Sequence, residues 1–555
     1  MREMKKWMLA AILVCGTSLF TACTSDKDDV QPGSETIDNE LAVKCINGTF
    51  IGKKTDNVIA YKGIPFVGQQ PVGNLRWKAP VEYTADNGVY EAYENAKGAC
   101  QAEGVVPSMG EDCLYLNVWK AEDTSAEKKP VMVWIHGGAF VGGGTGIDLF
   151  DCTNLIKENP DVIVVTVAYR LGVMGFLHLS HLSDGKDYPD AQNLGLLDQK
   201  MALKWVHENI AGFGGDPDNV TIWGESAGSA SCTLQALIEG SQNYFQKIIA
   251  QSGSVYAAMP VGCENAQSRT KALLEYTGCK TMDDIMALTE EELHEAYVNA
   301  VNQFMSSPYY GNEVLPEAPI ELYKKGYAKH ISIMAGSTAD ESRLFMGEGV
   351  KLSLEEQKIH AQHCVGEALR YLKEEDKKSY EEFQRVCRLQ EPGLIETEFL
   401  SEVIFRVALL QQLDVQSAFN KTFSYYWSYP GSNPDIGAAH SVELLFVFNL
   451  RGLGTSSPYN GSNISDEIFT SVQQMWTNFA RCGDPSTDQI EWKAYSAGDQ
   501  NVLVIAGPGD IHIEQDLLID QYKAVLPLVG YYQFMDKFFT PQYLMDIVAA
   551  REQKP

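Results

Sequence analysis

The sequence predicts an α/β fold in which a central, mostly parallel sheet is flanked by helices and carries large helical insertions. Two observations support this prediction. Apolar runs rich in β-branched residues, such as 131–136 (VMVWIH) and 162–169 (VIVVTVAY), are typical of strands buried on both faces. Segments with helical spacing lie between such runs, and strands that alternate with helices form parallel sheets covered on both sides.

Further elements follow in order along the chain. Residues 196–210 place apolar side chains at helical spacing with a polar side, which predicts an amphipathic helix. Residues 260–325 and 350–420 are acidic and helix-prone, which indicates insertions over the edge of the sheet. No linker divides the chain past residue 40, so a single domain is expected over residues 41–555. The remaining strands are expected at 220–223, 247–251, 331–335, 423–427 and 502–505.

Composition limits the class of partner. The 555 residues are 45% hydrophobic and 21% charged, which is typical of a globular protein with a large core. The formal net charge is −29 at pH 7. Such an acidic surface repels phosphate backbones, so nucleic acid is not expected as a partner.

The first 23 residues predict export. Arg2, Lys5 and Lys6 precede an apolar run and then small residues before Cys23, the order of a secretory signal. The small residue before Cys23 resembles the lipobox of bacterial lipoproteins, in which this cysteine carries the lipid. Residues 24–40 are polar and turn-forming, as in a flexible tether, and their acidic start resembles a surface-export signal. We therefore expect an exported, membrane-anchored lipoprotein whose only membrane contact is the anchor; the face of the membrane that it occupies, the cell surface included, stays open, and an ordinary secretory signal cut nearby is the alternative.

A Gly-x-Ser-x-Gly pentapeptide surrounds Ser226. An apolar run, 220–223, comes directly before Gly224, and a helix-compatible segment follows Gly228. Strand, sharp turn and helix are the context of a nucleophile elbow, in which the serine is strained and exposed. Side chains at the two glycines would clash where strand and helix pass each other. The N–H of Ala227 at the helix start would face a developing oxyanion.

A glycine-containing loop follows the expected strand at 131–136. His136-Gly137-Gly138-Ala139 matches the loop that supplies the other oxyanion N–H groups next to a nucleophile elbow. Because backbone amides bind the oxyanion, Gly138 and Ala139 serve equally well. We interpret the His136 side chain as a structural residue that orients the loop.

Two long motifs identify the sequence as similar to a known family. FGGDPDNVTIWGESAG around Ser226 and EDCLYLNV at 111–118 resemble type B carboxylesterases, in the cholinesterase and carboxylesterase branch of the α/β hydrolases. Shorter matches extend from about residue 43 to at least 485. The resemblance implies the α/β-hydrolase fold and a serine carboxylester hydrolase without metal or organic cofactor. It is greatest to bacterial para-nitrobenzyl-type esterases.

The resemblance also implies the other catalytic residues. The chain order of this fold is serine, acid, histidine. Glu341 stands where the family has its acid, with Asp340 as the competing candidate, and Ser342 replaces the family's glycine. His440 occupies the position of the base. Ser226 would then attack an ester and form an acyl-enzyme, with His440 as general base and Glu341 orienting it.

Supporting roles come from the same resemblance. Ser252 falls where the family has a serine near the acid, and Glu225 where it has a buried glutamate beside the nucleophile. Either residue could instead be plain packing polarity. Two disulfides are implied, Cys100 with Cys113 and Cys263 with Cys279, and export permits them. The histidines form no pattern with a third ligand, so no metal site is expected.

The substrate is less defined than the reaction. The segment between Cys100 and Cys113 (QAEGVVPSMGED) contains no aromatic residue, so it lacks the platform with which cholinesterases bind a quaternary ammonium. A small-molecule or polymer-bound ester is expected, with acyl and alcohol groups undetermined. The alternative to an enzyme is a catalytically silent surface binding or adhesion module of the same fold, and the presence of Ser226 argues against it.

Overall fold

A computed structural model describes residues 39–122, 127–179, 182–301, 304–347, 352–430, 437–451 and 465–539. The expected signal, Cys23 and most of the expected tether lie outside these residues. In the part of the chain that is described, no helix is long and apolar enough to cross a membrane.

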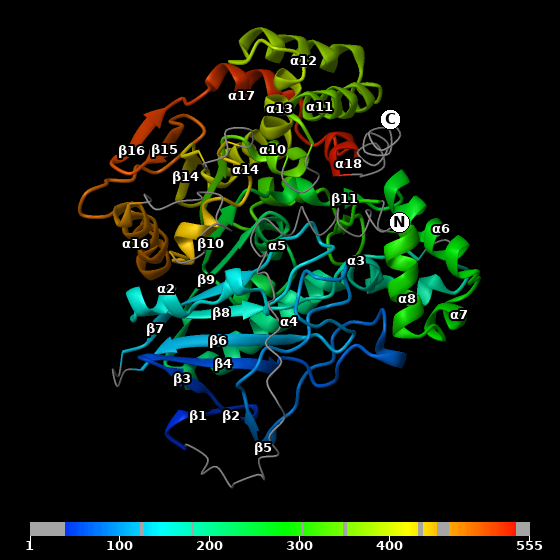
Figure 1. The fold of residues 1–555 in the computed structure, drawn as a ribbon, viewed down its shortest axis with the longest axis vertical. Coiled ribbons are helices and arrows are strands. Elements are labelled where there is room, and N and C mark those ends of the chain that lie inside the picture. Colours follow the sequence, from blue (N-terminus) through cyan, green and yellow to red (C-terminus); the bar gives the residue numbers. More distant parts are fainter. Residues whose placement is uncertain are drawn as a thin grey trace.

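The centre of the molecule is a sheet of 11 strands in the order β16-β15-β14-β13-β10-β9-β7-β8-β6-β4-β3 (Figure 1). The seven strands from β15 to β8 are parallel, and antiparallel strands extend both edges. A separate three-stranded sheet, β1-β2-β5, lies at one end of the molecule. The main sheet comprises β3 (Lys53–Thr55), β4 (Val58–Pro65), β6 (Tyr115–Ala121), β7 (Lys129–Ile135), β8 (Ile163–Val167), β9 (Gly215–Glu225), β10 (Lys247–Gln251), β13 (Ser332–Thr338), β14 (Thr422–Trp427), β15 (Asn501–Gly507) and β16 (Asp510–Gln515). The smaller sheets comprise β1 (Ala42–Cys45), β2 (Asn47–Ile51) and β5 (Asp86–Glu91), and the pair β11 (Met259–Pro260) and β12 (Tyr309–Tyr310).

Each of the seven apolar runs is a parallel strand of this sheet, so the predicted fold class is confirmed. Strand β7 shows why such runs are continuous. Val131, Val133 and Ile135 join the apolar cluster on one face of the sheet, and Met132 and Trp134 join the cluster on the other. A strand covered on both faces has no solvent side, so it carries no polar alternation.

Helices cover both faces of the sheet and form the two predicted insertions (Figure 1). The predicted amphipathic helix is α4 (Leu194–Asn209). The first insertion contains α6 to α9 and the second α11 to α14, and two π-helical turns, η10 (Tyr297–Val301) and η11 (Ser401–Arg406), lie within them. The other helices are α2 (Thr153–Glu158), α3 (Gly172–Gly175), α5 (Ala227–Gln235), α6 (Glu264–Thr277), α7 (Met282–Met286), α8 (Glu290–Ala296), α9 (Pro319–Lys324), α10 (Glu341–Gly347), α11 (Leu354–Leu369), α12 (Glu374–Val386), α13 (Leu394–Leu400), α14 (Val407–Gln416), α15 (Leu444–Val447), α16 (Asp466–Cys482), α17 (Ile519–Val525) and α18 (Gln533–Phe539).

The parallel strands place the candidate residues at one edge. Strand β9 ends at Glu225, directly before Ser226, and β13 ends at Thr338, three residues before Glu341. The carboxyl ends of parallel strands meet at the same edge of a sheet, where open α/β sheets bind their ligands.

Candidate active site

Ser226 lies in a strained turn between β9 and α5. Its φ of 58° and ψ of −123° are rare for a residue with a side chain, and the serine is only partly buried. A Cβ on Gly224 would lie 2.5 Å from Gly228 C, and one on Gly228 would lie 2.0 Å from Ile135 O. The two glycines are therefore required by the crowding that the sequence predicted, and the turn presents Ser226 at the strand end.

The loop after β7 lies against this turn. A Cβ on Gly137 would lie 3.1 Å from the Cβ of Ser226, so the loop backbone passes beside the serine. Gly138 and Ala139 follow with φ of 100° and 52°, respectively, a conformation that turns the loop back on itself. Ala227, the first residue of α5, follows Ser226 directly.

The side chain of His136 packs against Tyr169. Its ring stacks on Tyr169 with centroids 4.4 Å apart, and the Tyr169 hydroxyl donates to His136 O at 2.8 Å. Burial lowers the pKa of the imidazole to about 4, so the ring is neutral near pH 7. These contacts are those of a residue that orients the loop.

Glu341 contacts His440, and both side chains are buried. Glu341 Oε2 lies in hydrogen-bonding contact with His440 Nδ1. The other carboxylate oxygen, Oε1, accepts from Ser252 Oγ at 2.6 Å and from Thr338 N at 2.7 Å. Strand β13, helix α10 and the two loops that carry Ser252 and His440 therefore meet at this carboxylate, and the supporting role of Ser252 stays a prediction.

Asp340 points to different partners. Its carboxylate accepts from Ala438 N at 2.9 Å and pairs with Arg343 at 3.2 Å. Asp340 N also donates to Ala438 O, so this residue holds the loop that carries His440. Of the two adjacent acids, Glu341 is the one that contacts the imidazole.

A second carboxylate lies on the other side of the imidazole. Glu225 Oε1 is 2.8 Å from His440 Nε2 and also accepts from Ser441 Oγ at 2.6 Å. Burial by itself lowers the pKa of His440, but the charges of Glu225 and Glu341 outweigh burial and raise this pKa above its ordinary value. The sequence left packing polarity open as the role of Glu225; the structure places its carboxylate in contact with the site.

Two further residues near the site were missed by sequence reasoning. Glu443 is fully buried, and its Oε1 accepts from Gln251 Nε2 at 3.1 Å. Burial, with the charges of Glu225 and Glu341, raises the pKa of Glu443 to about 8, so this carboxyl is largely protonated at neutral pH. Ser441 and Glu443 lie one and three residues after His440, in the segment AAHSVELLFVF that resembles the family, but no role was assigned to them from the sequence.

Aromatic side chains pack on the imidazole. Phe345 of α10 and Phe405 of η11 lie 4.9 and 5.1 Å from the ring of His440, measured between centroids. Phe539 of α18 stacks edge-on against Phe345 at 5.0 Å. Three elements thus build an apolar wall beside the candidate base, which the sequence did not indicate because they are distant along the chain.

The cysteines of the described residues are all free thiols. Cys100 Sγ lies 3.7 Å from Glu290 Oε1, and Cys263 Sγ lies 4.0 Å from Met259 Sδ. The pairings of Cys100 with Cys113 and of Cys263 with Cys279 stay predictions. No group of three or more potential metal ligands occurs in the part of the chain that the structure describes.

The fold and the serine turn define an α/β hydrolase, and comparison with known proteins gives the family. The chain belongs to the carboxylesterase family, which it matches over residues 39–521, and it is a carboxylesterase. It is 33% identical to the para-nitrobenzyl esterase of Bacillus subtilis (strain 168) over 503 residues, covering 87% of this chain and 98% of that protein. It is 30% identical to the cholinesterase of Mus musculus over 502 residues, covering 81% of this chain and 79% of that protein.

Solved structures agree with this assignment. A thermophilic para-nitrobenzyl esterase superposes with a TM-score of 0.75 at 30% identity, covering 88% of this chain and all of that one. A carboxylesterase of Geobacillus stearothermophilus superposes with a TM-score of 0.76 at 32% identity, covering 87% and 99%. The prediction of a hydrolase that acts on carboxylic esters is confirmed.

Proposed function

We propose that this carboxylesterase cleaves its substrate through an acyl-enzyme on Ser226, with His440 as general base and acid and Glu341 as the residue that orients the imidazole. The contact between Glu341 Oε2 and His440 Nδ1 is the observation that supports this proposal most strongly. It assigns Nδ1 to the acid, and in the proposed reaction Nε2, which lies beside Glu225 Oε1 in this structure, receives the serine proton.

In the proposed reaction, Ser226 is the nucleophile and His440 transfers its proton. His440 Nε2 takes the proton of Ser226 as Oγ attacks the ester carbonyl, and the carbonyl π electrons move to oxygen. The N–H groups of Gly138, Ala139 and Ala227 bind that oxyanion; one such donor is worth about 3 kcal/mol of barrier in other hydrolases. The tetrahedral intermediate collapses as His440 protonates the leaving alcohol. Water then repeats the sequence and releases the acid.

Glu225 supports the charged intermediate. When Nε2 holds the serine proton, the imidazolium lies between the carboxylates of Glu225 and Glu341. Opposite charges at such distances favour the protonated form. Ser252 holds Oε1 of Glu341 in place, so Oε2 stays aligned with the ring.

The substitution Ser226→Ala tests the proposal. Purified wild type should hydrolyse p-nitrophenyl butyrate, and the variant should lose at least about 10³-fold in kcat, as happens when a serine nucleophile is removed. Ser254→Ala is a matched control, since this buried serine follows β10 and caps a short turn. Wild-type activity in Ser226→Ala would refute the assignment.

For its location we propose a lipid anchor on Cys23, supported by the order of charged, apolar and small residues before it. Metabolic labelling of the expressed protein with a palmitate analogue should mark wild type and fail on Cys23→Ser. Equal labelling of both would reject the anchor.

A further inference from the structure

One buried side chain holds the glycine-rich turn that follows Gly138 and Ala139. Gln101 is fully buried, and its amide pairs with the backbone of Gly143 in both directions. Gln101 Oε1 accepts from Gly143 N at 2.8 Å, and Gln101 Nε2 donates to Gly143 O at 2.8 Å. Nε2 also donates to Ala99 O at 2.9 Å. Two hydrogen bonds from one planar amide fix both the position and the orientation of the Gly143 backbone.

Gly143 lies directly against the start of the loop that follows β7. Its φ of 115° is a conformation that residues with a side chain rarely adopt. A Cβ there would collide with the ring of His136 and would lie 2.8 Å from Gly137 O. The backbone that Gln101 holds is therefore in close contact with the residues that precede Gly138.

The turn also sets the direction of the Ala139 N–H. Gly142 N donates to Gly138 O at 3.0 Å, which holds that carbonyl in place. The Gly138 carbonyl and the Ala139 N–H belong to one planar trans peptide, so they point in opposite directions. Because Gly142 is bonded covalently to Gly143, the contact with Gln101 reaches the Ala139 N–H through the turn.

We propose that Gln101 is a positioning residue of the oxyanion hole. This inference rests on the proposed acyl-enzyme mechanism, in which the Ala139 N–H binds the oxyanion. Donors that are already oriented stabilise developing charge because they need no reorganisation during the reaction. Gln101 touches neither the substrate nor the reacting atoms. Its loss should therefore weaken binding of the oxyanion more than binding of the uncharged ester.

Two ketones separate these two kinds of binding. Ser226 Oγ should add to the carbonyl carbon of 1,1,1-trifluorooctan-2-one, while its proton passes to His440 and the carbonyl π electrons move to oxygen. The product is a bound tetrahedral oxyanion, which resembles the transition state. Octan-2-one lacks the fluorines that make the carbonyl carbon electrophilic, so it reports binding of the uncharged ketone. Inhibition constants for both are measured against hydrolysis of p-nitrophenyl butyrate.

The substitution Gln101→Leu removes both hydrogen bonds to Gly143. We expect it to raise the inhibition constant of the trifluoromethyl ketone and to lower kcat, each at least about tenfold, since removing a whole oxyanion donor costs about 10²- to 10³-fold in other hydrolases. The KM and the inhibition constant of octan-2-one should be nearly unchanged. Rates are divided by the number of sites that react with a fluorophosphonate, so unfolded protein does not contribute.

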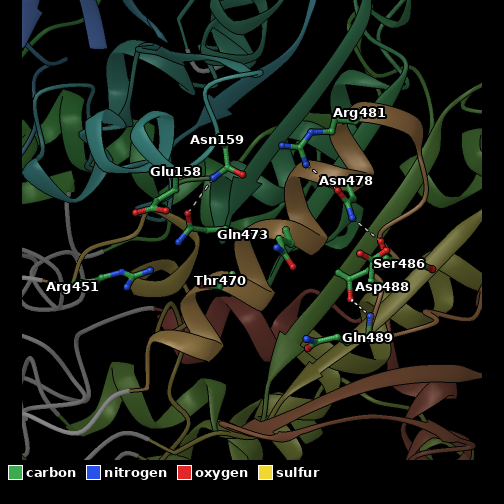
Figure 2. A pocket seen from close by; sticks show the side chains of 12 residues that line it. Glu158, Asn159, Arg451, Thr470, Gln473, Asn478, Arg481, Ser486, Asp488 and Gln489 are labelled. Carbon is green, nitrogen blue, oxygen red and sulfur yellow. Dashed lines mark hydrogen bonds between the residues drawn. The ribbon is translucent and has the colours of Figure 1, made fainter. Parts of the chain in front are cut away.

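Two buried glutamines outside the loop are matched controls. Gln416 of α14 donates to two backbone carbonyls just before β13, at 2.9 and 2.6 Å. Gln473 of α16 is 3% exposed and accepts from Asn159 Nδ2 at 3.2 Å (Figure 2). Gln416→Leu and Gln473→Leu should lower the melting temperature, because they too remove buried amide hydrogen bonds. Neither should change the ratio of the two inhibition constants.

The substitution Gln101→Glu should restore the contact at pH 6. Burial favours the neutral form of the introduced carboxyl, which can accept from Gly143 N and donate to Gly143 O as the amide does. Relative to wild type at the same pH, this variant should recover most of the affinity for the trifluoromethyl ketone. If Gln101→Leu does not fold, Gln101→Asn takes its place, because its shorter amide cannot reach both backbone groups.

The inference is overturned if the Gln101 variant that lacks the contact loses no more affinity for the trifluoromethyl ketone than the two controls do. Equal loss of affinity for both ketones, or no recovery in Gln101→Glu, would overturn it as well. Unchanged binding of the trifluoromethyl ketone by Ser226→Ala would instead refute the acyl-enzyme mechanism on which the inference rests.

Discussion

At the scale of single residues, the orientation of two adjacent acids decides which one can serve the histidine. Glu341 turns toward His440 Nδ1, and Asp340 turns toward Ala438 N and Arg343. Sequence resemblance favoured Glu341, but the residues alone left Asp340 open. The side-chain contacts supply the physical reason for the choice.

Substitution of each acid should separate their roles. We expect Glu341→Gln to lower kcat by about 10³- to 10⁴-fold, because the amide cannot stabilise the imidazolium and favours the wrong tautomer. Asp340→Asn should keep most of the activity and lose stability instead. Steady-state hydrolysis of p-nitrophenyl butyrate and thermal unfolding measure both effects. A larger loss of kcat in Asp340→Asn would assign the acid to that residue.

The pH dependence of kcat/KM should show the effect of the Glu225 and Glu341 carboxylates on the pKa of His440. Glu225 and Glu341 raise the pKa of His440 above 6.5, and the base must be neutral to accept a proton. The kcat/KM of wild type should therefore fall as pH drops through a pKa above that value. Glu225→Gln removes one raising charge, so the acid limb should move to lower pH.

The control for this shift is Asp340→Asn, since Asp340 does not contact the ring. Its acid limb should coincide with that of wild type. If Glu225→Gln left the limb unmoved, Glu225 would not act on the titration of His440.

At the scale of elements, the start of α10 is fastened to the second insertion. Ser342 N donates to Ser401 Oγ at 3.1 Å, and Ser342 Oγ donates to Thr397 O at 2.7 Å. Ser342 is the residue that replaces the family's glycine. Its hydroxyl donates to Thr397 of α13 and accepts from Ser401 Oγ of η11, the turn that carries Phe405, at 3.0 Å, and a glycine could make neither contact.

Removing the hydroxyl of Ser401 should weaken the attachment of Ser342 to the second insertion. Ser401→Ala leaves the buried N–H of Ser342 without an acceptor, which costs about 1–3 kcal/mol. We expect a lower urea midpoint, together with a several-fold loss of kcat at nearly unchanged KM, because Glu341 is the neighbouring residue. Ser401→Thr keeps the hydroxyl and should retain both properties. A urea midpoint equal to that of wild type in Ser401→Ala would contradict the role of this contact.

The sequence predicted the parallel strands better than the antiparallel ones, for a physical reason. Strands such as β8 are covered on both faces, so they appear as unbroken apolar runs. Strand β16 lies at the sheet edge with most side chains exposed, and its sequence, DIHIEQ, contains no such run. The position of β16 in the sheet results from its pairing with the neighbouring strand, which its local sequence does not indicate.

The candidate site could likewise be predicted only in part from the sequence. Ser226 could be predicted because crowding at the turn requires glycines two positions away on either side. The wall of Phe345, Phe405 and Phe539 could not, because its members come from three elements that only the tertiary fold brings together. The contact of Glu225 with Ser441 is likewise a product of the fold.

At the scale of the whole molecule, one sheet joins segments from Lys53 to Gln515. The number of independently folding domains is still a prediction. The two disulfides, which would bear on the stability of the chain, are predictions as well. A bond between Cys100 and Cys113 would close a short loop and stabilise the chain by about 3 kcal/mol.

Thiol counting tests the disulfides. Ten cysteines, all free thiols in this structure, lie between residues 45 and 482. If both predicted pairs form after export, the denatured mature protein should react with a thiol reagent at six of these ten positions, and reduction should restore the other four. Ten reactive thiols before reduction would show that neither pair forms.

The acyl-enzyme on Ser226 is the central claim, and covalent trapping tests it most directly. The protein is treated with a fluorophosphonate, digested and analysed by tandem mass spectrometry. We predict one modified residue, Ser226, with no label on that peptide in Ser226→Ala. Modification of a different residue, or full esterase activity in protein labelled at Ser226, would contradict the account.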